Sequence, residues 1–546
     1  MRAFRGFFRL IIILAALGFF LLPISCVSTK PGKTKENFVS QDNAAKEPLK
    51  GSEIKPEVPE TPNISGKGPL EITVRDAILI ALENNRSLVV EQFNPVIQQT
   101  FEDQEQAVFD PVTGAEISAG REELQRQART GSGTESSEVD IYLGGISLEQ
   151  FFPTGTFVEV DATNRTSESS LYENPFSSTR LELSVTQPLL RGYGRDVNLV
   201  RLRQARLETD ITRYELRGFS QSLLARVETA YWDYALAQRQ VEIVQESLKV
   251  AKQQLSETEE MIRIGTMAEA EMAAVQAEVA AQQQGLINAR SNLDSSRLQL
   301  LRLLNPPGNN LWDRDIKLIY QPTIPDILLD KVTDHVAISL SMRPEINQAK
   351  LSVQQDDLEI IRTKNGLLPV MDLFISLGKT GYADSFSGSV SDLTGDSYDV
   401  EGGIRFEYPL KNRDAKARHR RAVMSREQAE KALDNLSQLV ELDVRDAYIE
   451  VNRAKQQIAA SSATRKFQEE THRIETEKFR VGRSTNFLVA QAQRDLLVAK
   501  ISEVNAVVDY LKSLINLYRL DGSLLERRGI LAPGKEPVKS FINPQS

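Results

Sequence analysis

Apolar residues recur at a seven-residue period over the stretch 196–262, with Glu, Gln, Arg and Lys between them. One row holds Val227, Tyr234, Val241, Leu248, Leu255 and Ile262, and a second holds Ala230, Ala237, Val244, Ala251 and Thr258. This period is typical of a coiled-coil seam. Only Gly218 disfavours a helix within the stretch. The pattern therefore predicts one helix of 67 residues (262−196+1), roughly 100 Å long.

A tight turn is predicted after this helix, at Ile264-Gly265-Thr266. Gly265 suits the left-handed position past a helix end, and Arg263 complements the negative end of the helix dipole. Residues 266–269, from Thr266 to Glu269, have the spacing of a capping box for a second helix. That helix continues the heptad period and stops before Asn305. The stretch therefore predicts a helical hairpin.

The hairpin pattern occurs twice in the chain. The matching positions are Tyr231 with Tyr448, Gly265 with Gly482, and Leu303 with Leu520, each 217 residues apart (448−231, 482−265, 520−303). A constant offset indicates a duplicated hairpin without insertions. The second seam is weaker, because Arg465 and His472 fall on its apolar row. We therefore expect the two hairpins not to be interchangeable.

Alternation with a period of two predicts strands near 112–121, 139–150, 156–165 and 178–187, and in the second repeat near 373–377 and 404–408. Polar loops are expected at 130–137 and 381–399. The strand region of the first repeat is 37 residues longer than that of the second. Matching positions before the strands, Leu82 and Leu340, are 258 residues apart, whereas matching positions after them, Pro188 and Pro409, are 221 apart. We assign the excess to an extra hairpin around Pro153-Thr154-Gly155, which leaves about four strands per chain, with a possible additional hairpin.

These segments are compatible with a soluble sandwich, but their outward faces are apolar and each run leads into a long helix through Pro188 or Pro409. Four to six strands cannot span a bilayer alone, because an open sheet leaves backbone N–H and C=O groups unpaired in hydrocarbon. Several copies would have to close one barrel. Before the strands, 73–99 reads as a helix with a turn at Asn84-Asn85 and a break or kink at Pro95.

The N-terminus has the charge order of a secretory signal. Arg2, Arg5 and Arg9 precede an apolar run over 10–22 that is too short for a comfortable membrane span. The run ends in Leu22-Pro23-Ile24-Ser25-Cys26, which resembles a bacterial lipobox, although Pro23 replaces the usual leucine. The resemblance implies diacylglycerol and an N-acyl chain such as palmitate on Cys26, the only cysteine. The alternative is ordinary cleavage nearby, with Cys26 incidental.

The predicted domain organisation follows from these patterns. It comprises a signal peptide (1–25), a disordered tether rich in Lys, Glu, Ser and Pro (26–69), a first repeat (70–305), an inter-repeat collar segment (306–334), a second repeat (335–522) and a C-terminal tail (523–546).

The composition of the chain argues against several classes of function. Charged residues make up 26% and aromatic residues 7% of the chain, which fits long polar helices better than several dense cores. A net charge of −9 argues against nucleic-acid binding. One cysteine and three dispersed histidines argue against a disulfide framework and a zinc site. Because no nucleotide-binding or hydrolase motif appears, we expect no enzyme activity, no catalytic residues, no metal and no cofactor.

The chain resembles the TolC-type outer-membrane efflux proteins over about 70–522. The resemblance is carried by the duplicated strand and hairpin units, Thr186-Gln187-Pro188-Leu189-Leu190, the glycines of both hairpin tips and Val489-Ala490-Gln491-Ala492-Gln493. It implies a mixed α and β fold: a homotrimer whose strands form one outer-membrane barrel continuous with a periplasmic α-helical tunnel. Such a protein is a passive exit duct for an inner-membrane pump, joined through a periplasmic adaptor (membrane fusion protein).

The resemblance also implies functional positions. The hairpin tips, with Arg263, Gly265, Thr266, Phe479, Arg480 and Gly482, would dock the adaptor. An acidic residue six positions past the tip glycine would contribute to a periplasmic constriction; here that is Glu271, whereas the second hairpin has Leu488. Arg483 and Arg494 are candidate partners that would offset repulsion between three such carboxylates. The alternative is that Glu271 lies on a solvated flank and supports its own helix N-terminus.

Two other functions are weighed against the duct. Long heptad rods also build trimeric surface stalks or envelope scaffolds that transport nothing. A stalk needs only parallel strands of one long coil, whereas antiparallel hairpins returning to a membrane sheet favour a closed tube. An envelope enzyme carried on a coiled coil would need a compact module, for which 306–340 and the tail are too short; both segments are expected to wrap the helices as a mixed collar.

Overall fold

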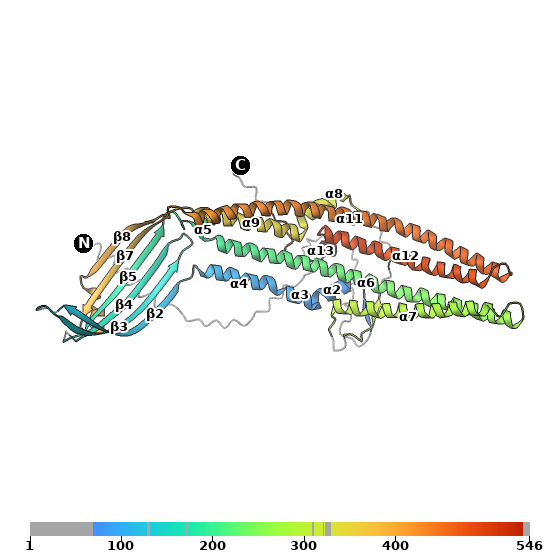
Figure 1. The fold of residues 1–546 in the computed structure, drawn as a ribbon, viewed down its shortest axis with the longest axis horizontal. Coiled ribbons are helices and arrows are strands. Elements are labelled where there is room, and N and C mark those ends of the chain that lie inside the picture. The colour runs from blue at the N-terminus through green and yellow to red at the C-terminus, as the bar shows by residue number, and fades with distance from the viewer. Residues whose placement is uncertain are drawn as a thin grey trace, which may run out of the picture. The chain divides into compact units, whose positions relative to one another are not determined.

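The computed structural model describes residues 69–127, 131–170, 173–307, 311–319, 322 and 329–538. Two long helical hairpins and one six-stranded antiparallel sheet make up most of this part of the chain (Figure 1). The predicted signal peptide, Cys26 and nearly all of the predicted tether lie outside the described residues. Within the described part, no helix is both long and apolar enough to cross a membrane.

The first hairpin consists of α6 (Val200–Arg263) and α7 (Glu271–Leu304), and the second of α11 (Arg413–Arg480) and α12 (Asn486–Leu520). The predicted heptad row is buried at Val227, Tyr234 and Leu248. The long helix starts later than predicted, because 195–198 form a separate short helix, α5 (Arg195–Asn198). Asn198 at its end donates to the carbonyls of Gly192 (2.8 Å) and Gly194 (3.1 Å), which holds a turn in front of α6.

Both hairpin turns have the predicted glycine geometry. Gly265 and Gly482 have φ of 75° and 72°, and the ends of α6 and α11 keep the offset of 217 (480−263). The predicted capping box is wrong. Thr266 instead closes α6, since its N–H and its hydroxyl both donate to the Met261 carbonyl at 2.9 Å. The reason is that α7 begins at Glu271, too far along for Thr266 to be its N-cap.

Shorter helices extend the bundle. Helix α4 (Phe93–Ala107) packs on α6, and α9 (Pro344–Asn365) packs on both α6 and α11. The predicted break near Pro95 is found at Gln92, between α3 and α4, so Pro95 lies in the first turn of α4, where its missing N–H has no helical acceptor. The predicted turn at Asn84-Asn85 is confirmed: α2 (Val74–Asn84) ends there, and Asn85 caps α3 (Arg86–Glu91).

The sheet has the order β2-β3-β4-β5-β7-β8. Its strands are β2 (Val112–Gln127), β3 (Thr134–Phe151), β4 (Phe157–Ser169), β5 (Phe176–Pro188), β7 (Val370–Ala383) and β8 (Tyr398–Glu407). The first repeat thus contributes four strands and the second two, with a β3–β4 turn at the expected Pro153-Thr154-Gly155. Two expected loops are partly wrong: 134–137 belong to β3, and 381–399 contain α10 (Phe386–Ser391) and the 3-10 helix η2 (Asp392–Thr394).

The segments that precede and join the repeats rest on α6. Strand β1 (Leu70–Ile72) pairs in parallel with β6 (Ile316–Leu318). The hydroxyl of Tyr234 on α6 donates to the Ile316 carbonyl at 3.0 Å. Helices α8 (Val332–Met342) and α13 (Leu524–Arg527) complete the described elements.

Candidate functional site

The sheet has one apolar and one polar face. On the apolar face, cross-strand partners are Ile146 with Ala162, Val160 with Leu183, Leu183 with Leu377, and Leu373 with Ile404. The side chains remain exposed at both edges, with Ile117 on β2 at 93% and Ile404 on β8 at 63%. The other face carries polar partners such as Asp161 with Glu182. An apolar band whose side chains remain exposed at both edges of the sheet is what strands need to meet lipid.

The two edges of this sheet are open. Strand β2 pairs only with β3, and β8 pairs only with β7, among the strands that the structure describes. Their outer backbone N–H and C=O groups lack ladder partners within one chain, and an open edge is unstable in hydrocarbon. The sheet of the described residues thus ends in two unpaired edges.

The hairpin tips expose charged and apolar side chains together. Arg263 is paired with Glu260 at 2.6 Å and Arg480 with Glu477 at 3.1 Å, and both arginines remain largely solvent-exposed. Beside them Ile264 is also exposed. Each turn closes with the same bond pattern, Gly265 N–H to Ile262 and Gly482 N–H to Phe479. The predicted tip residues are thus presented by rigid turns.

Phe479 does not belong to this exposed surface. Its side chain is only 6% exposed, because it lies on the buried side of the last turn of α11. The exposed aromatic residue near that turn is Phe487, at 62%, in the first turn of α12, where Thr485 is the N-cap. The signal in the sequence that could have found Phe487 is its place just after a capping threonine, where a helix begins.

Glu271 is the first residue of α7 and is half-buried between the two hairpins. Asn486, the buried first residue of α12, donates from Nδ2 to Glu271 Oε2 at 3.3 Å. The expected arginine partners do not pair with Glu271 within the described chain. Arg494 instead binds Glu278 at 2.6 Å, because Glu278 lies two turns further along α7. Glu271 thus lies at a helix N-terminus and at the contact between the hairpins.

A cluster of buried polar residues fastens the C-terminal segment to α6 and α8. Arg528 donates to both carboxylate oxygens of Glu228, at 2.7 and 2.6 Å, and Glu228 is only 1% exposed. Arg217 pairs with Glu526, and His335 lies 2.7 Å from Asp521 with both side chains fully buried. The sequence gives no sign of this cluster, since no local pattern links residues 300 positions apart.

A family model described as outer membrane efflux protein matches residues 80–306 and 337–523. These 414 residues (227+187) are more than half of the 546 in the chain. The chain belongs to the outer membrane efflux protein family. A comparison of the sequence with curated proteins gives no match.

Solved outer-membrane channels have the same fold as this outer membrane efflux protein. The Campylobacter jejuni CmeC outer membrane channel is 15% identical, with 89% of this chain and 95% of that chain covered and a TM-score of 0.60. The open state of the Neisseria gonorrhoeae MtrE outer membrane channel is 18% identical, with coverages of 83% and 89% and a TM-score of 0.58. The Vibrio cholerae outer membrane protein VceC is 14% identical, with coverages of 82% and 96% and a TM-score of 0.60.

Membership of this family gives the two parts of the fold their roles. The strands are the outer-membrane barrel portion and the long helices are the tunnel portion of an efflux channel. The chain is therefore an outer-membrane exit duct for efflux. The surface-stalk alternative leaves the exposed apolar face of the sheet without a role.

Proposed function

We propose that three copies of this chain form one channel, and that this homotrimer receives cargo from an inner-membrane pump through a periplasmic adaptor. The observation that carries the proposal is the six-stranded sheet with an exposed apolar band and two open edges. Pairing β8 of each copy with β2 of the next removes every edge. Three copies would give 18 strands (3×6), and barrels of about 16–18 strands enclose an aqueous channel.

The helices support the same stoichiometry. Four long helices per chain give a ring of twelve in a trimer (3×4). At about 10 Å between neighbouring axes, such a ring is roughly 38 Å across, and subtracting one helix thickness leaves a lumen of roughly 28 Å. A lumen of that width passes small molecules. The channel is passive in this proposal, because energy for transport comes from the pump.

Disulfide cross-linking across the proposed strand junction tests the trimer. Since Cys26 is the only cysteine, Cys26→Ser gives a cysteine-free background. One cysteine in β2 near Ile117 and one scanned along β8 near Ile404 should yield covalent trimers under oxidation in at least one register. A matched pair in the interior strands β4 and β7 should give none. Folded protein that yields only monomers and dimers in every register contradicts the proposal.

We further propose that Cys26 carries the lipid and anchors the chain to the outer membrane without building the channel. The 26–69 stretch between Cys26 and β1 has no apolar pattern with which to dock. Cys26→Ser should therefore lose incorporated fatty acid and still assemble. Normal export of the variant with loss of its trimers would show that the lipid is needed for assembly.

A further inference from the structure

The β7–β8 connection folds back over the apolar face of the sheet. Ser389 on α10 places its hydroxyl 2.7 Å from the Thr179 hydroxyl on β5 and 3.4 Å from Asn164 Nδ2 on β4. Asn164 and Thr179 are cross-strand partners. Thr179 lies two residues from Leu181 and four from Leu183, so all three side chains are on one face. Helix α10 therefore covers the end of the face that carries the apolar band.

The position of α10 is fixed by its contacts. A Cβ atom at Gly381 would lie 2.1 Å from the Ser389 carbonyl oxygen, so only glycine allows this approach. Beyond the helix, Asp392 accepts from the Tyr382 N–H at 2.9 Å, and the Lys379 ammonium donates to the Gly395 carbonyl. The segment is thus held against β7 both within α10 and beyond its end.

The point of contact lies one membrane span from the helical end of β5. Residues 179–188 number ten (188−179+1), and a tilted strand needs about 9–11 residues to cross a bilayer. The apolar residues Leu181, Leu183 and Val185 fall within these ten, and Ser177 and Thr179 follow them towards the other end of the strand. The side chains thus change from apolar to polar where α10 rests, as expected at the outer boundary of the hydrocarbon.

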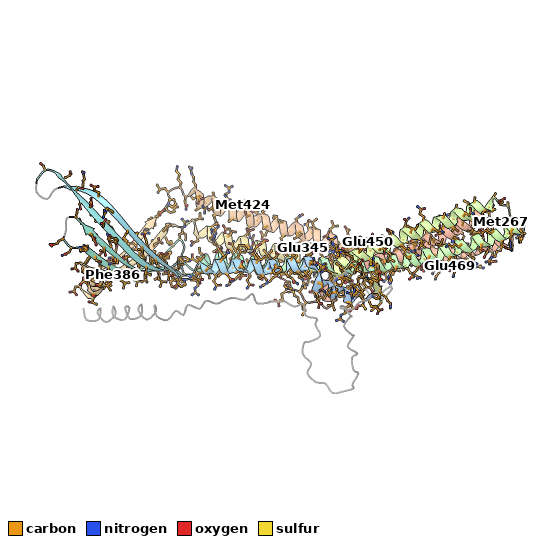
Figure 2. The ribbon with its side chains drawn as sticks, turned by 90° about the horizontal axis from the view of Figure 1, so that it is seen from below. Met267, Glu345, Phe386, Met424, Glu450 and Glu469 are labelled. Carbon is orange, nitrogen blue, oxygen red and sulfur yellow. The ribbon has the colours of Figure 1, made fainter. Side chains whose placement is uncertain are left out.

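Two apolar side chains of α10 are exposed. Phe386 is 61% exposed and Val390 is 40% exposed, and Figure 2 labels Phe386 on this helix. Their spacing of four residues places them on one side of the helix. Water does not stabilise an exposed phenylalanine ring, whereas a membrane interface does, because the ring is then buried among lipids.

We propose that α10 is an interfacial helix that inserts Phe386 and Val390 between the headgroups of the outer leaflet. The occupant of this surface is lipid, because α10 rests directly beside the apolar band of Leu181, Leu183 and Val185, where the boundary of the hydrocarbon is expected. The inference rests on the proposed function only in that the apolar face must itself meet lipid. Helix α10 lies on that face through its contact with β5, and the adjoining η2 packs on β7.

Spin-label accessibility tests the proposal in the full-length protein. In the Cys26→Ser background, single nitroxide labels are placed at Phe386, at Val390, at Ile375 within the apolar band, and at Asp384 in the exposed turn before α10. The trimer is reconstituted in vesicles of phosphatidylcholine and phosphatidylglycerol. Collision rates are then measured with oxygen, which partitions into lipid, and with a water-soluble nickel chelate.

Labels at Phe386→Cys and Val390→Cys should collide with the nickel chelate several-fold less often than the label at Asp384→Cys, and with oxygen more often. Two positions are labelled so that one variant still tests the proposal if the other folds poorly. If both labels match Asp384→Cys while Ile375→Cys is lipid-exposed, the interfacial helix is disproved and the barrel stands. Shielding of both labels from both probes would show a protein contact and also disprove it. A water-accessible Ile375→Cys would instead contradict the proposed function.

Discussion

At the scale of single residues, the ion pair between Glu228 and Arg528 joins α6 to the C-terminal segment. Glu228 is 1% exposed and accepts two hydrogen bonds, whereas Arg528 is partly open to solvent. Glu228→Ala should lower the free energy of unfolding by about 2 kcal/mol, because it leaves a partly desolvated guanidinium unpaired. The measurement is chemical denaturation of the trimer, with Glu441→Ala as the control. Glu441 pairs with Arg445 at the surface, so loss of this pair should lower the free energy of unfolding by at most about 0.5 kcal/mol. Equal effects would contradict this role for Glu228.

His472 makes stability depend on pH. Burial, reinforced by the nearby Lys500, lowers the pKa of His472 below its usual value. The unfolded state then binds more protons, so the free energy of unfolding is highest above the unfolded pKa, about 6.5, and falls as the pH drops through the folded pKa. His472→Gln should flatten the pH dependence of the thermal midpoint between about pH 5 and pH 7. An unchanged slope would show that other groups dominate.

Channel conductance distinguishes two roles for Glu271, one in a constriction and one in supporting the N-terminus of α7. If three copies face the channel axis, Glu271→Gln should reduce cation preference and weaken block by divalent ions in planar bilayers. Some cation preference should remain, because the polar face of the sheet keeps Glu149, Glu159 and Asp161. If Glu271 only supports α7 and its bond to Asn486, the current–voltage curve and the divalent block stay unchanged. Unchanged currents of this kind would exclude Glu271 from the constriction.

At the scale of elements, the hairpin tips are the predicted adaptor-docking surface. Arg263 and Arg480 are exposed on turns fixed by Gly265 and Gly482, so reversing their charge should leave the rods folded. The variant Arg263→Glu with Arg480→Glu should lose most of its copurification with a tagged periplasmic adaptor. Arg473→Glu, an equally exposed charge further back on α11, is the matched control. Normal adaptor recovery by the double variant would rule out docking through these arginines.

The elements that the sequence predicted are those with local causes. A heptad period fixes which side of a helix is buried, and a glycine fixes where the chain can take a positive φ, so α6 and both turns were predictable. Thr266 was misjudged as a capping residue because its role depends on where α7 begins, and the burial of Phe479 depends on which side of α11 faces its neighbour. Helix α10 was missed because the contact of Ser389 with Thr179 is long-range.

At the scale of the whole molecule, β2 and β8 are edge strands without a second strand partner in the described chain, and in the proposed channel other copies would complete the barrel. The sequence predicts the same closure by several copies, since four to six strands cannot close on themselves, and it stays a prediction. It could not predict how the C-terminal segment locks onto α6 through Arg217 and Glu228, because those partners are about 300 residues away. Long-range ion pairs leave no periodic trace in a sequence.

The most direct test of the exit-duct function is single-channel recording. Purified wild-type protein is added to a planar lipid bilayer, and the current is followed at fixed voltage. If the chain is an outer-membrane exit duct, discrete and uniform current steps should appear and scale with salt concentration, as expected for an aqueous lumen. Folded trimers that insert into the bilayer and give no current steps under any voltage or salt condition would contradict that function.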